Sequence, residues 1–445
     1  MAVFTPLIHY VLMHSTRKNG VKALVAFLAV FIYKYRSHAV GTRRRPDLKQ
    51  PKGAIPVFGH MLLLASVPGT RLYEFFEKQS NELGPCWSIS LPFIGRMIQI
   101  DTPENVEYVL KTNFWNYEKG PILRASLSDL LGKGIFNSDG ADWKYQRKLA
   151  SHIFNVEAFR EYTSDVFVIE GKKALDYLGK AADEGIVIDF HALMLHYTLD
   201  TFGTFGCLEN VDQEVPFAIS LDGLTRICSD RLMDPIWKIR EHLTGVSKKA
   251  DYDKQLIRGH GLEIIQRRRK EGYHARKKDL LQLFIEARDG KGQSLSDELL
   301  VDIIINFTAT LRIFPSLPRN MKLCVKDDVL PDGTKIHAGE WVTWSSYVMG
   351  RSELVWGPDA KEFKPSRWIN TERPSQGRFN SFHVGPRVCL GQQFATIEAL
   401  TLIGMIFGSF ELSLVEPSKA PPYGVSITMP MLEGLKVRVT RRTKL

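Results

Sequence analysis

Residues 382–391, with the sequence FHVGPRVCLG, decide how this chain folds. Cys389 is the one cysteine of this stretch and lies just before residues 392–404, whose apolar periodicity predicts a helix. The positive potential at a helix N-terminus favours a thiolate, and a buried thiolate is a metal ligand. Gly385 and Gly391 allow backbone conformations that other residues avoid, so the chain can approach a flat group closely. The stretch therefore predicts a metal bound through sulfur beside a flat ligand; the alternative is a structural cysteine in a glycine-rich loop.

The same stretch resembles the haem-binding loop of cytochromes P450 at five fixed positions, Phe382, Gly385, Arg387, Cys389 and Gly391. The resemblance implies a mainly α fold with small β-sheets, the cytochrome P450 haem-thiolate fold. It implies haem b as the cofactor and Cys389 as the axial ligand of the haem iron. Phe382 would pack near the sulfur, and Gly385 and Gly391 would let the loop approach the ring. Arg387 would bind a haem propionate, since a guanidinium can hold a carboxylate through two hydrogen bonds.

Two further motifs resemble the same family. Trp143 and Arg147 are four residues apart and share one face of a predicted helix, and in the family such a pair holds a haem propionate. On the residues alone, such a pair is more often a core tryptophan and a surface arginine. Residues 363–368, FKPSRW, resemble the segment whose arginine, here Arg367, stabilises the proximal side of the fold. Lys322 is an additional propionate candidate.

The net charge is concentrated at the N-terminus. The 445 residues carry +10, and residues 1–50 contain nine Lys or Arg and one acid, a local charge of +8, which leaves +2 for the rest. A nearly neutral body argues against a nucleic-acid-binding protein. Five widely spaced cysteines argue against a disulfide framework and favour a reducing compartment.

The apolar run 23–33, ALVAFLAVFIY, is flanked by basic residues. It predicts a membrane anchor over residues 1–40 with a cytosolic body, at the endoplasmic reticulum. A cleaved secretory signal is the alternative. Residues 41–60 are basic and rich in proline, which predicts a stiff hinge. Residues 61–445 would form the haem-thiolate domain.

Local patterns predict small β pieces in a helical body. They predict a helix over residues 71–83, a hairpin over 86–100 and mostly helix over 103–289. Pro331-Asp332-Gly333 predicts a turn between two strands, and the alternation in 435–439 predicts an edge strand.

Two family elements are missing near residues 308–311. The long helix over the distal haem face begins, with Ser294 as a possible cap, but lacks the Ala-Gly-x-(Asp/Glu)-Thr segment that relays protons to oxygen. No distal catalytic residue is therefore assigned. Arg312 matches the arginine of the family's Glu-x-x-Arg motif, and Ala309 stands where its glutamate belongs. One internal deletion of several tens of residues explains both losses, through a splice variant or a faulty gene model; a natural loss is the alternative.

The resemblance is greatest to P450s that hydroxylate long-chain fatty acids near the ω end. It implies a monooxygenase that inserts one oxygen atom of O₂ into a lipid or long-chain fatty acid. Electrons would come from NADPH through NADPH–cytochrome P450 reductase, docked on the proximal face near Lys144 and Lys148. Residues 114–133 and 202–232 would line the channel for a hydrophobic substrate.

The deletion changes this expectation for the present chain. We expect impaired turnover because the proton relay is absent. Loss of the glutamate would also leave Arg312 and Arg367 poorly paired, at a cost of about 3–5 kcal/mol. Two alternatives remain: a P450-like isomerase or lyase of lipid hydroperoxides, which carry their own oxygen, and a non-catalytic, haem-binding truncated isoform.

Overall fold

The computed structural model describes most of the chain. The described residues are 17–154, 157–203, 216–232, 234, 236–271, 284–287, 293–302, 318–362, 364–369, 372, 374–418, 422–424 and 429–443.

Helices make up most of the described elements. They are α2 (Arg17–Lys34), α3 (Met61–Ala65), α4 (Leu72–Leu83), α5 (Pro103–Glu107), α6 (Gly120–Leu131), α7 (Gly140–Phe154), α8 (Glu157–Glu184), α9 (Phe190–Gly203), α10 (Pro216–Arg231), α11 (Trp237–Thr244), α12 (Val246–Glu271), α15 (Ser346–Met349), α16 (Glu353–Trp356) and α17 (Gln392–Ser409). Shorter helical turns are η1 (Gly69–Arg71), η2 (Tyr108–Thr112), η3 (Phe114–Asn116), η6 (Pro365–Trp368) and η7 (Gly385–Arg387).

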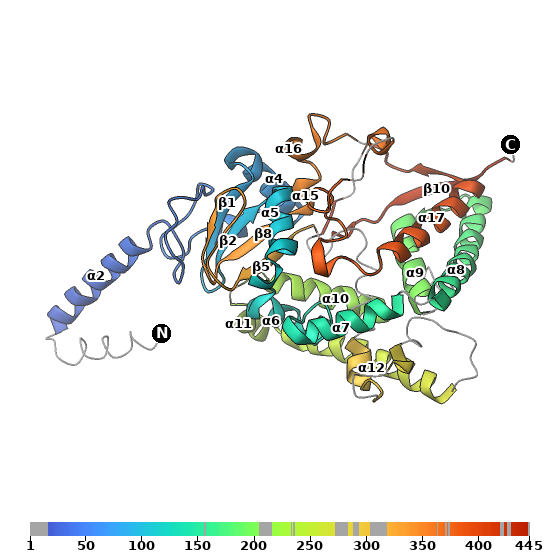
Figure 1. The fold of residues 1–445 in the computed structure, drawn as a ribbon, viewed down its shortest axis with the longest axis horizontal. Coiled ribbons are helices and arrows are strands. Elements are labelled where there is room, and N and C mark those ends of the chain that lie inside the picture. Colours follow the sequence, from blue (N-terminus) through green and yellow to red (C-terminus); the bar gives the residue numbers. More distant parts are fainter. Residues whose placement is uncertain are drawn as a thin grey trace.

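The strands are short. They are β1 (Cys86–Leu91), β2 (Gly95–Ile100), β3 (Tyr117–Glu118), β4 (Val187–Asp189), β5 (Asn320–Cys324), β6 (Asp328–Val329), β7 (Lys335–Ile336), β8 (Trp341–Trp344), β9 (Phe410–Leu414) and β10 (Lys436–Arg441). Figure 1 shows β1, β2, β5 and β8 gathered in one half of the molecule and α8, α9 and α17 in the other. The predicted mainly α fold with small sheets is confirmed.

The largest sheet has the strand order β1-β2-β8-β5-β3. β1 and β2 form the predicted antiparallel hairpin, with Cys86 opposite Ile100. β8 then joins β2 in parallel, with Met97 opposite Trp341. This pairing ties the first quarter of the chain to the segment after residue 318, and the buried Trp87 and Trp341 lie in one core cluster.

The predicted helix over 71–83 and the turn at 331–333 are confirmed. α4 ends at Leu83, where Gly84 takes φ +94°. β6 and β7 pair across the turn, with Gly333 at φ +84°. The helix expected after Ser294 begins instead at Asp297, because the Leu299 N–H donates to the Ser296 hydroxyl over 3.3 Å.

The prediction of an edge strand at 435–439 is wrong. β10 is the central strand of the sheet β4-β10-β9 and pairs antiparallel with both neighbours. Val437 and Val439 are buried while their neighbours are exposed. Alternation reports that one face of a strand is buried, and it carries no information about which edges are paired.

The proline-rich linker lies against the largest sheet. Ala39 and His60 are fully buried, Ala39 bridges to Val57, and the Ser88 N–H donates to the Lys49 carbonyl over 2.9 Å. The linker is therefore held by contacts along its length in addition to the stiffness of its prolines.

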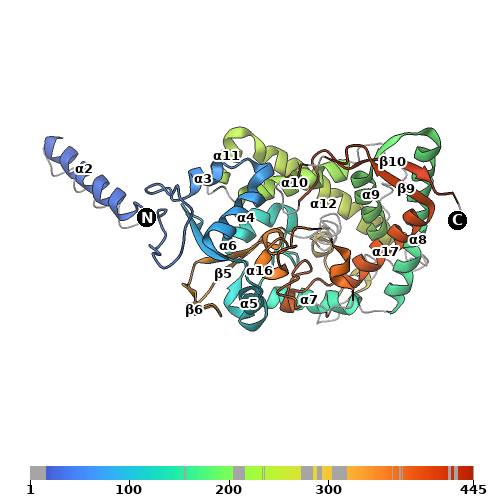
Figure 2. The same ribbon diagram turned by 90° about the horizontal axis from the view of Figure 1, so that it is seen from above.

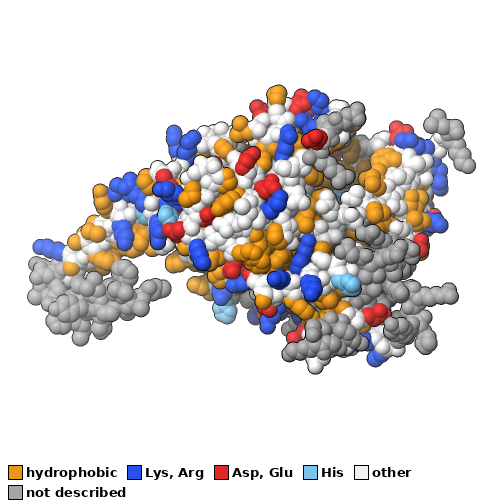
Figure 3. All heavy atoms as spheres, in the orientation of Figure 1, with side chains coloured by type: hydrophobic (Ala, Val, Ile, Leu, Met, Phe, Trp, Pro, Cys, Tyr) orange, Lys and Arg blue, Asp and Glu red, His pale blue; other side chains and the backbone are white. Residues whose placement is uncertain are grey.

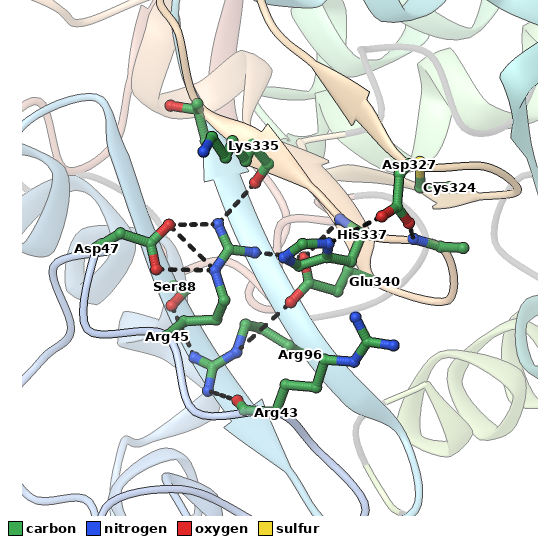
Figure 4. A network of polar contacts seen from close by, with 12 residues as sticks. Arg43, Arg45, Asp47, Ser88, Arg96, Cys324, Asp327, Lys335, His337 and Glu340 are labelled. Atoms are coloured by element: carbon green, nitrogen blue, oxygen red, sulfur yellow. Dashed lines mark hydrogen bonds and ion pairs between the residues drawn. The ribbon is translucent and has the colours of Figure 1, made fainter.

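A buried ion network fixes the linker at Arg45 (Figure 4). The Arg45 guanidinium binds Asp47 at 2.7 Å and Glu340 at 2.5 Å, and it donates to the Lys335 carbonyl. Arg96 lies on the other side of Glu340, at 3.9 Å, and donates to the Ser88 hydroxyl. Burial alone would lower the pKa of Arg45, but its hydrogen bonds to Asp47 and Glu340 raise that pKa. We call Arg45, Asp47, Arg96 and Glu340 the linker clamp.

α2 projects from the body in both ribbon views (Figures 1 and 2). Several of its apolar side chains are exposed, including Val25 and Val30. Among the helices in the part of the chain that the structure describes, none has the length and apolar character to cross a membrane.

Candidate functional site

The loop that carries Cys389 is a tight turn. The Cys389 backbone N–H donates to the Phe382 carbonyl over 2.8 Å, and Gly391 occupies the position before α17. Gly385 adopts φ +66°, and a Cβ there would collide with the Leu110 carbonyl of η2. Glycine at this position is therefore required by the contact between the loop and η2.

The Cys389 thiol is under opposing influences. Burial raises its pKa, whereas the Gly391 N–H and the positive charge of Arg147 act to lower it. Both of these groups favour the thiolate, which is the form that ligates metals. The Gly391 N–H, just before α17, is thus the backbone donor to the Cys389 sulfur.

Arg387 joins the loop to the start of α7. One of its Nη atoms donates to the Asp139 carboxylate over 2.7 Å and to the Ser138 carbonyl over 3.0 Å. Its guanidinium lies 4.4 Å from the centre of the Trp143 ring. Its Nε is buried without a hydrogen-bond partner among the described residues. Arg387 therefore keeps a donor available for a further acceptor.

Trp143 and Arg147 lie on one face of α7, as their spacing predicts. Trp143 is buried and Arg147 is half-buried. Burial lowers the pKa of Arg147, and the nearby Cys389 acts to raise it. On the opposite side of the helix, Lys144 and Lys148 are exposed. α7 thus has one face toward the cysteine loop and one toward solvent.

Two lysines complete this region. Lys322 of β5 is 3% exposed, and its Nζ has no hydrogen-bond partner among the described residues. Burial, with the charges of Arg387 and Lys119, lowers the pKa of Lys322 far below its ordinary value. Burial and Arg387 lower the pKa of Lys119 to about 7. We call Lys119, Arg147, Lys322 and Arg387 the cation cluster.

The pKa of His383 is affected by the same positive charges. Burial, together with Lys322, Lys119 and Arg387, lowers its pKa to about 3, so the imidazole is neutral at physiological pH. The carboxylates that act on the cluster are those of Glu118 and Asp139. The lowered pKa values of Lys119 and Lys322 show that these amino groups lie in a buried, positive environment. A bound anion would raise both pKa values and charge the amino groups, so the site is suited to anionic groups.

The residues present fit haem. Haem b carries two carboxylates, and Lys322 Nζ and Arg387 Nε, which have no hydrogen-bond partner among the described residues, could bind them. Cys389 would ligate the iron through sulfur. Trp143 would form part of the wall beside the ring.

Sequence reasoning missed Lys119, Asp139 and His383 and gave Lys322 little weight. Lys119 follows the two-residue strand β3, and β3 pairs with β5, which carries Lys322. This pairing joins residues about 200 positions apart, so no local pattern indicates it. The sequence itself shows only one lysine directly after a short strand and another in the middle of a second strand.

Arg367 differs from its sequence-based expectation. It pairs with the Asp359 carboxylate at 2.8 Å and donates to the carbonyls of Trp356 and Asp359, so it is not poorly paired. It also borders a cavity of about 360 Å³ lined in part by Trp368 and Phe379. Arg312 and Phe363 lie outside the described residues.

Asp302 anchors the helix that begins at Asp297. Its carboxylate accepts from the Lys133 N–H over 3.0 Å and from Arg258 over 2.6 Å. A Cβ at Gly132 would overlap this carboxylate. The segment expected to lack the distal acid and threonine, residues 303–317, lies outside the described residues, as does part of the predicted channel over 202–232.

A cysteine before a long apolar helix, with basic side chains beside it, fits a haem-thiolate site. The family model of cytochrome P450 matches residues 49–309 and 310–433. The chain therefore belongs to the cytochrome P450 family.

Curated relatives agree with this assignment. "Cytochrome P450 monooxygenase cyp1" of Mycosarcoma maydis is 30% identical, over 92% of this chain and 78% of its own length. Cytochrome P450 86B1 of Arabidopsis thaliana is 30% identical, over 96% of this chain and 91% of its own length. Cytochrome P450 94B3 of the same plant is 30% identical, over 94% and 97%. By family, the protein is a haem-dependent monooxygenase that takes electrons from a redox partner and acts on hydrophobic molecules.

Proposed function

We propose that this P450 uses Cys389 as the axial ligand of haem iron and hydroxylates a long-chain fatty acid or a similar lipid. The observation that carries the proposal is the half-buried Cys389 with the basic side chains of the cation cluster beside it. The lipid class rests on the resemblance of the sequence to fatty-acid ω-hydroxylases.

The bound haem would activate O₂, and the balanced reaction is RH + O₂ + two electrons + two protons to ROH + H₂O. The Cys389 thiolate would supply electron density to the iron. The Gly391 N–H would moderate the charge on the sulfur. Arg147, Arg387, Lys119 and Lys322 would hold the propionates. Trp143 would exclude water from that edge of the ring.

Electron supply and membrane attachment are parts of the same proposal. NADPH would be the electron source, through NADPH–cytochrome P450 reductase, and the exposed Lys144 and Lys148 on α7 are suited to an acidic partner surface. Residues 1–40, with the exposed apolar side chains of α2, would attach the protein to the endoplasmic reticulum, facing the cytosol. The clamped linker over 41–60 would carry that attachment to the haem-thiolate domain, residues 61–445.

We further propose that the chain lacks an internal block between residues 309 and 310. The family match divides at that point. The alignment with cytochrome P450 86B1 spans 514 positions but uses 96% of 445 residues, about 427, so about 87 positions face no residue of this chain. The alignment with cytochrome P450 94B3 spans 497 positions and uses 94%, about 418, which leaves about 79. The 445-residue chain would then turn over poorly, since the distal proton relay falls in the missing block.

The ferrous–CO spectrum tests the ligand. We expect the red-shifted Soret band of a thiolate-ligated haem from the 445-residue chain, and its complete loss in Cys389→Ser. Cys86→Ser is the matched control, because Cys86 lies on β1, where its sulfur contacts the Thr334 hydroxyl at 3.2 Å, and it should leave the band unchanged. A band that survives in Cys389→Ser would disprove the assignment.

Turnover measurements test the proposed hydroxylation and the proposed effect of the missing block. With reductase and NADPH, we expect little fatty-acid hydroxylation by the 445-residue chain and clear hydroxylation after a relative's block is inserted between residues 309 and 310. Normal turnover by the 445-residue chain would contradict the proposed impairment. Turnover of a lipid hydroperoxide without NADPH would identify the isomerase or lyase alternative, and no turnover in either chain would favour a haem-binding remnant.

A further inference from the structure

Asp139 is a buried carboxylate at the junction of three segments of the chain. Its Oδ1 accepts a hydrogen bond from Arg387 of the cysteine loop over 2.7 Å. Its Oδ2 accepts from the Lys119 backbone N–H, directly before α6, over 3.0 Å, and from Arg124 of α6 over 3.4 Å. Asp139 itself lies directly before α7. One carboxylate therefore joins the cysteine loop, α6 and α7.

The local sequence explains why this carboxylate lies where it does. Gly140, the first residue of α7, has φ +60°, a conformation that glycine adopts without strain. The Trp143 N–H, in the first turn of α7, donates to the Asp139 carbonyl over 3.4 Å. The positive potential at the helix N-terminus favours a negative charge at this position. The position of Asp139 is thus fixed by the helix that carries Trp143.

Arg387 is held between the Asp139 carboxylate and the Trp143 ring. The side chains of Arg387 and Asp139 are only 10% and 6% exposed, and the guanidinium lies 4.4 Å from the centre of the Trp143 ring. The Nη atom that binds Asp139 also donates to the Ser138 carbonyl. These contacts engage one end and one face of the guanidinium. Since a guanidinium is planar and rigid, they also fix the direction of its Nε–H, which has no hydrogen-bond partner among the described residues.

The charge of Arg387 depends on the same carboxylate. Figure 3 shows many Lys and Arg side chains at the surface of the molecule, where water stabilises their charge. Arg387 is largely removed from water, and burial lowers its pKa to about 10, whereas Asp139 acts to raise that pKa. Without Asp139, the guanidinium would lose its ion-pair partner at 2.7 Å. Asp139 therefore both orients Arg387 and stabilises its positive charge.

We propose that Asp139 is a positioning residue for haem, which acts by keeping Arg387 charged and oriented to bind a haem carboxylate. The inference rests on the proposed function, in which Arg387 holds a propionate. A carboxylate by itself repels another carboxylate, so a favourable contribution of Asp139 to haem binding has to act through Arg387. Charge repulsion alone predicts that removing the Asp139 charge tightens haem binding, whereas the positioning role predicts that it weakens haem binding.

The rate of haem release distinguishes these two signs. Asp139→Asn and Asp142→Asn are made in the 445-residue chain, and the transfer of haem from each to an apo acceptor protein is timed. We expect about tenfold faster release from Asp139→Asn, because a charged hydrogen bond that holds Arg387 is lost. Asp142→Asn is the matched control, since Asp142 is an exposed acid in the first turn of α7; it should release haem at the wild-type rate.

An Arg387→Met background tests the route of the effect. There, Asp139→Asn should not accelerate haem release any further, because the residue through which Asp139 acts is gone. In the single variant Asp139→Asn, the ferrous–CO band should stay at the wavelength of a thiolate-ligated haem, since the Cys389 ligand is unchanged.

Three results would overturn the inference. One is haem release from Asp139→Asn at the wild-type rate or below it. The second is an equal acceleration in the Arg387→Met background. The third is loss of the thiolate band in Asp139→Asn, which would show that Asp139 supports the cysteine loop as a whole. Slow release from Asp139→Asn, in a chain whose wild type shows the thiolate band, contradicts this inference and leaves the proposed function intact.

A haem-free measurement covers the case in which the 445-residue chain binds no haem, a result that would contradict the proposed function itself. In urea denaturation of the haem-free chain, the midpoint shifts of Asp139→Asn and Arg387→Met should not add up in the double variant, because both changes break the same ion pair. Shifts that add up would show that Asp139 does not hold Arg387 and would overturn the inference.

Discussion

The linker clamp and the cation cluster both bring basic side chains to the largest sheet, and they differ in charge balance. In the clamp, Arg45 and Arg96 face Asp47 and Glu340, two charges against two. In the cluster, burial and the neighbouring Arg387 lower the pKa values of Lys119 and Lys322, and Lys322 Nζ has no hydrogen-bond partner among the described residues. A group that is balanced in charge needs no external ion. An added anion would charge the lysines of the cluster, which marks the cluster as a candidate binding site.

The largest expected effect is on the clamp. Glu340→Gln should lower the free energy of unfolding by about 3–5 kcal/mol, because it leaves Arg45 and Arg96 buried with too little negative charge. Urea denaturation of the haem-free chain measures this. Glu82→Gln, in an exposed ion pair with Lys78 at 3.7 Å, is the control and should change stability by less than about 1 kcal/mol. A loss for Glu340→Gln no larger than the control's would contradict the balance argument.

A substitution in the cation cluster should change the free energy of unfolding in the opposite direction. Lys322→Met removes a buried amino group that has no hydrogen-bond partner among the described residues, so it should raise the stability of the haem-free chain by about 1–3 kcal/mol. The same change should weaken haem retention about tenfold, about 1.4 kcal/mol, measured by haem transfer to an apo acceptor protein. Lys326→Met, at an exposed site on the next loop, should alter neither quantity. A destabilised haem-free Lys322→Met chain would show that the lysine has a structural role.

The smallest effect concerns a buried acid outside both groups. Burial raises the pKa of Glu398 to about 8, from an ordinary value of 4.5, and the hydrogen bond from Thr201 opposes this shift. The folded state therefore keeps a proton that the unfolded state releases, so stability falls as pH rises between these two values. The slope from this group is at most about 1.4 kcal/mol per pH unit.

Glu398→Gln should remove that slope, since an amide oxygen can still accept from Thr201. Thermal midpoints of the two chains should agree near pH 4.5 and diverge toward pH 8, where the variant should be the more stable. Thr198→Val, on the same helix α9 but with its hydroxyl bonded to the Leu195 carbonyl, is the control for the pH profile. Parallel profiles for wild type and Glu398→Gln would contradict the raised pKa.

Much of the secondary structure could be predicted from local sequence. The hairpin over 86–100, the helix over 71–83 and the turn at 331–333 follow from glycine, proline and alternation, which act on neighbouring residues. The edge-strand prediction for 435–439 failed because strand partners are chosen by segments far away in the chain. The prediction that Arg367 is poorly paired was also wrong. Asp359, eight residues before Arg367, forms the ion pair that the family motif assigns to the missing glutamate.

By itself, the sequence determined the family of this protein: a phenylalanine, two glycines, an arginine and a cysteine, in fixed spacing before an apolar helix, are enough to indicate a cytochrome P450. It also indicated a break near residues 308–311. Only the tertiary structure showed that Lys119 and Lys322 lie close to Arg387. Charge balance and burial depend on residues brought together from distant parts of the chain, and local spacing carries no record of those contacts.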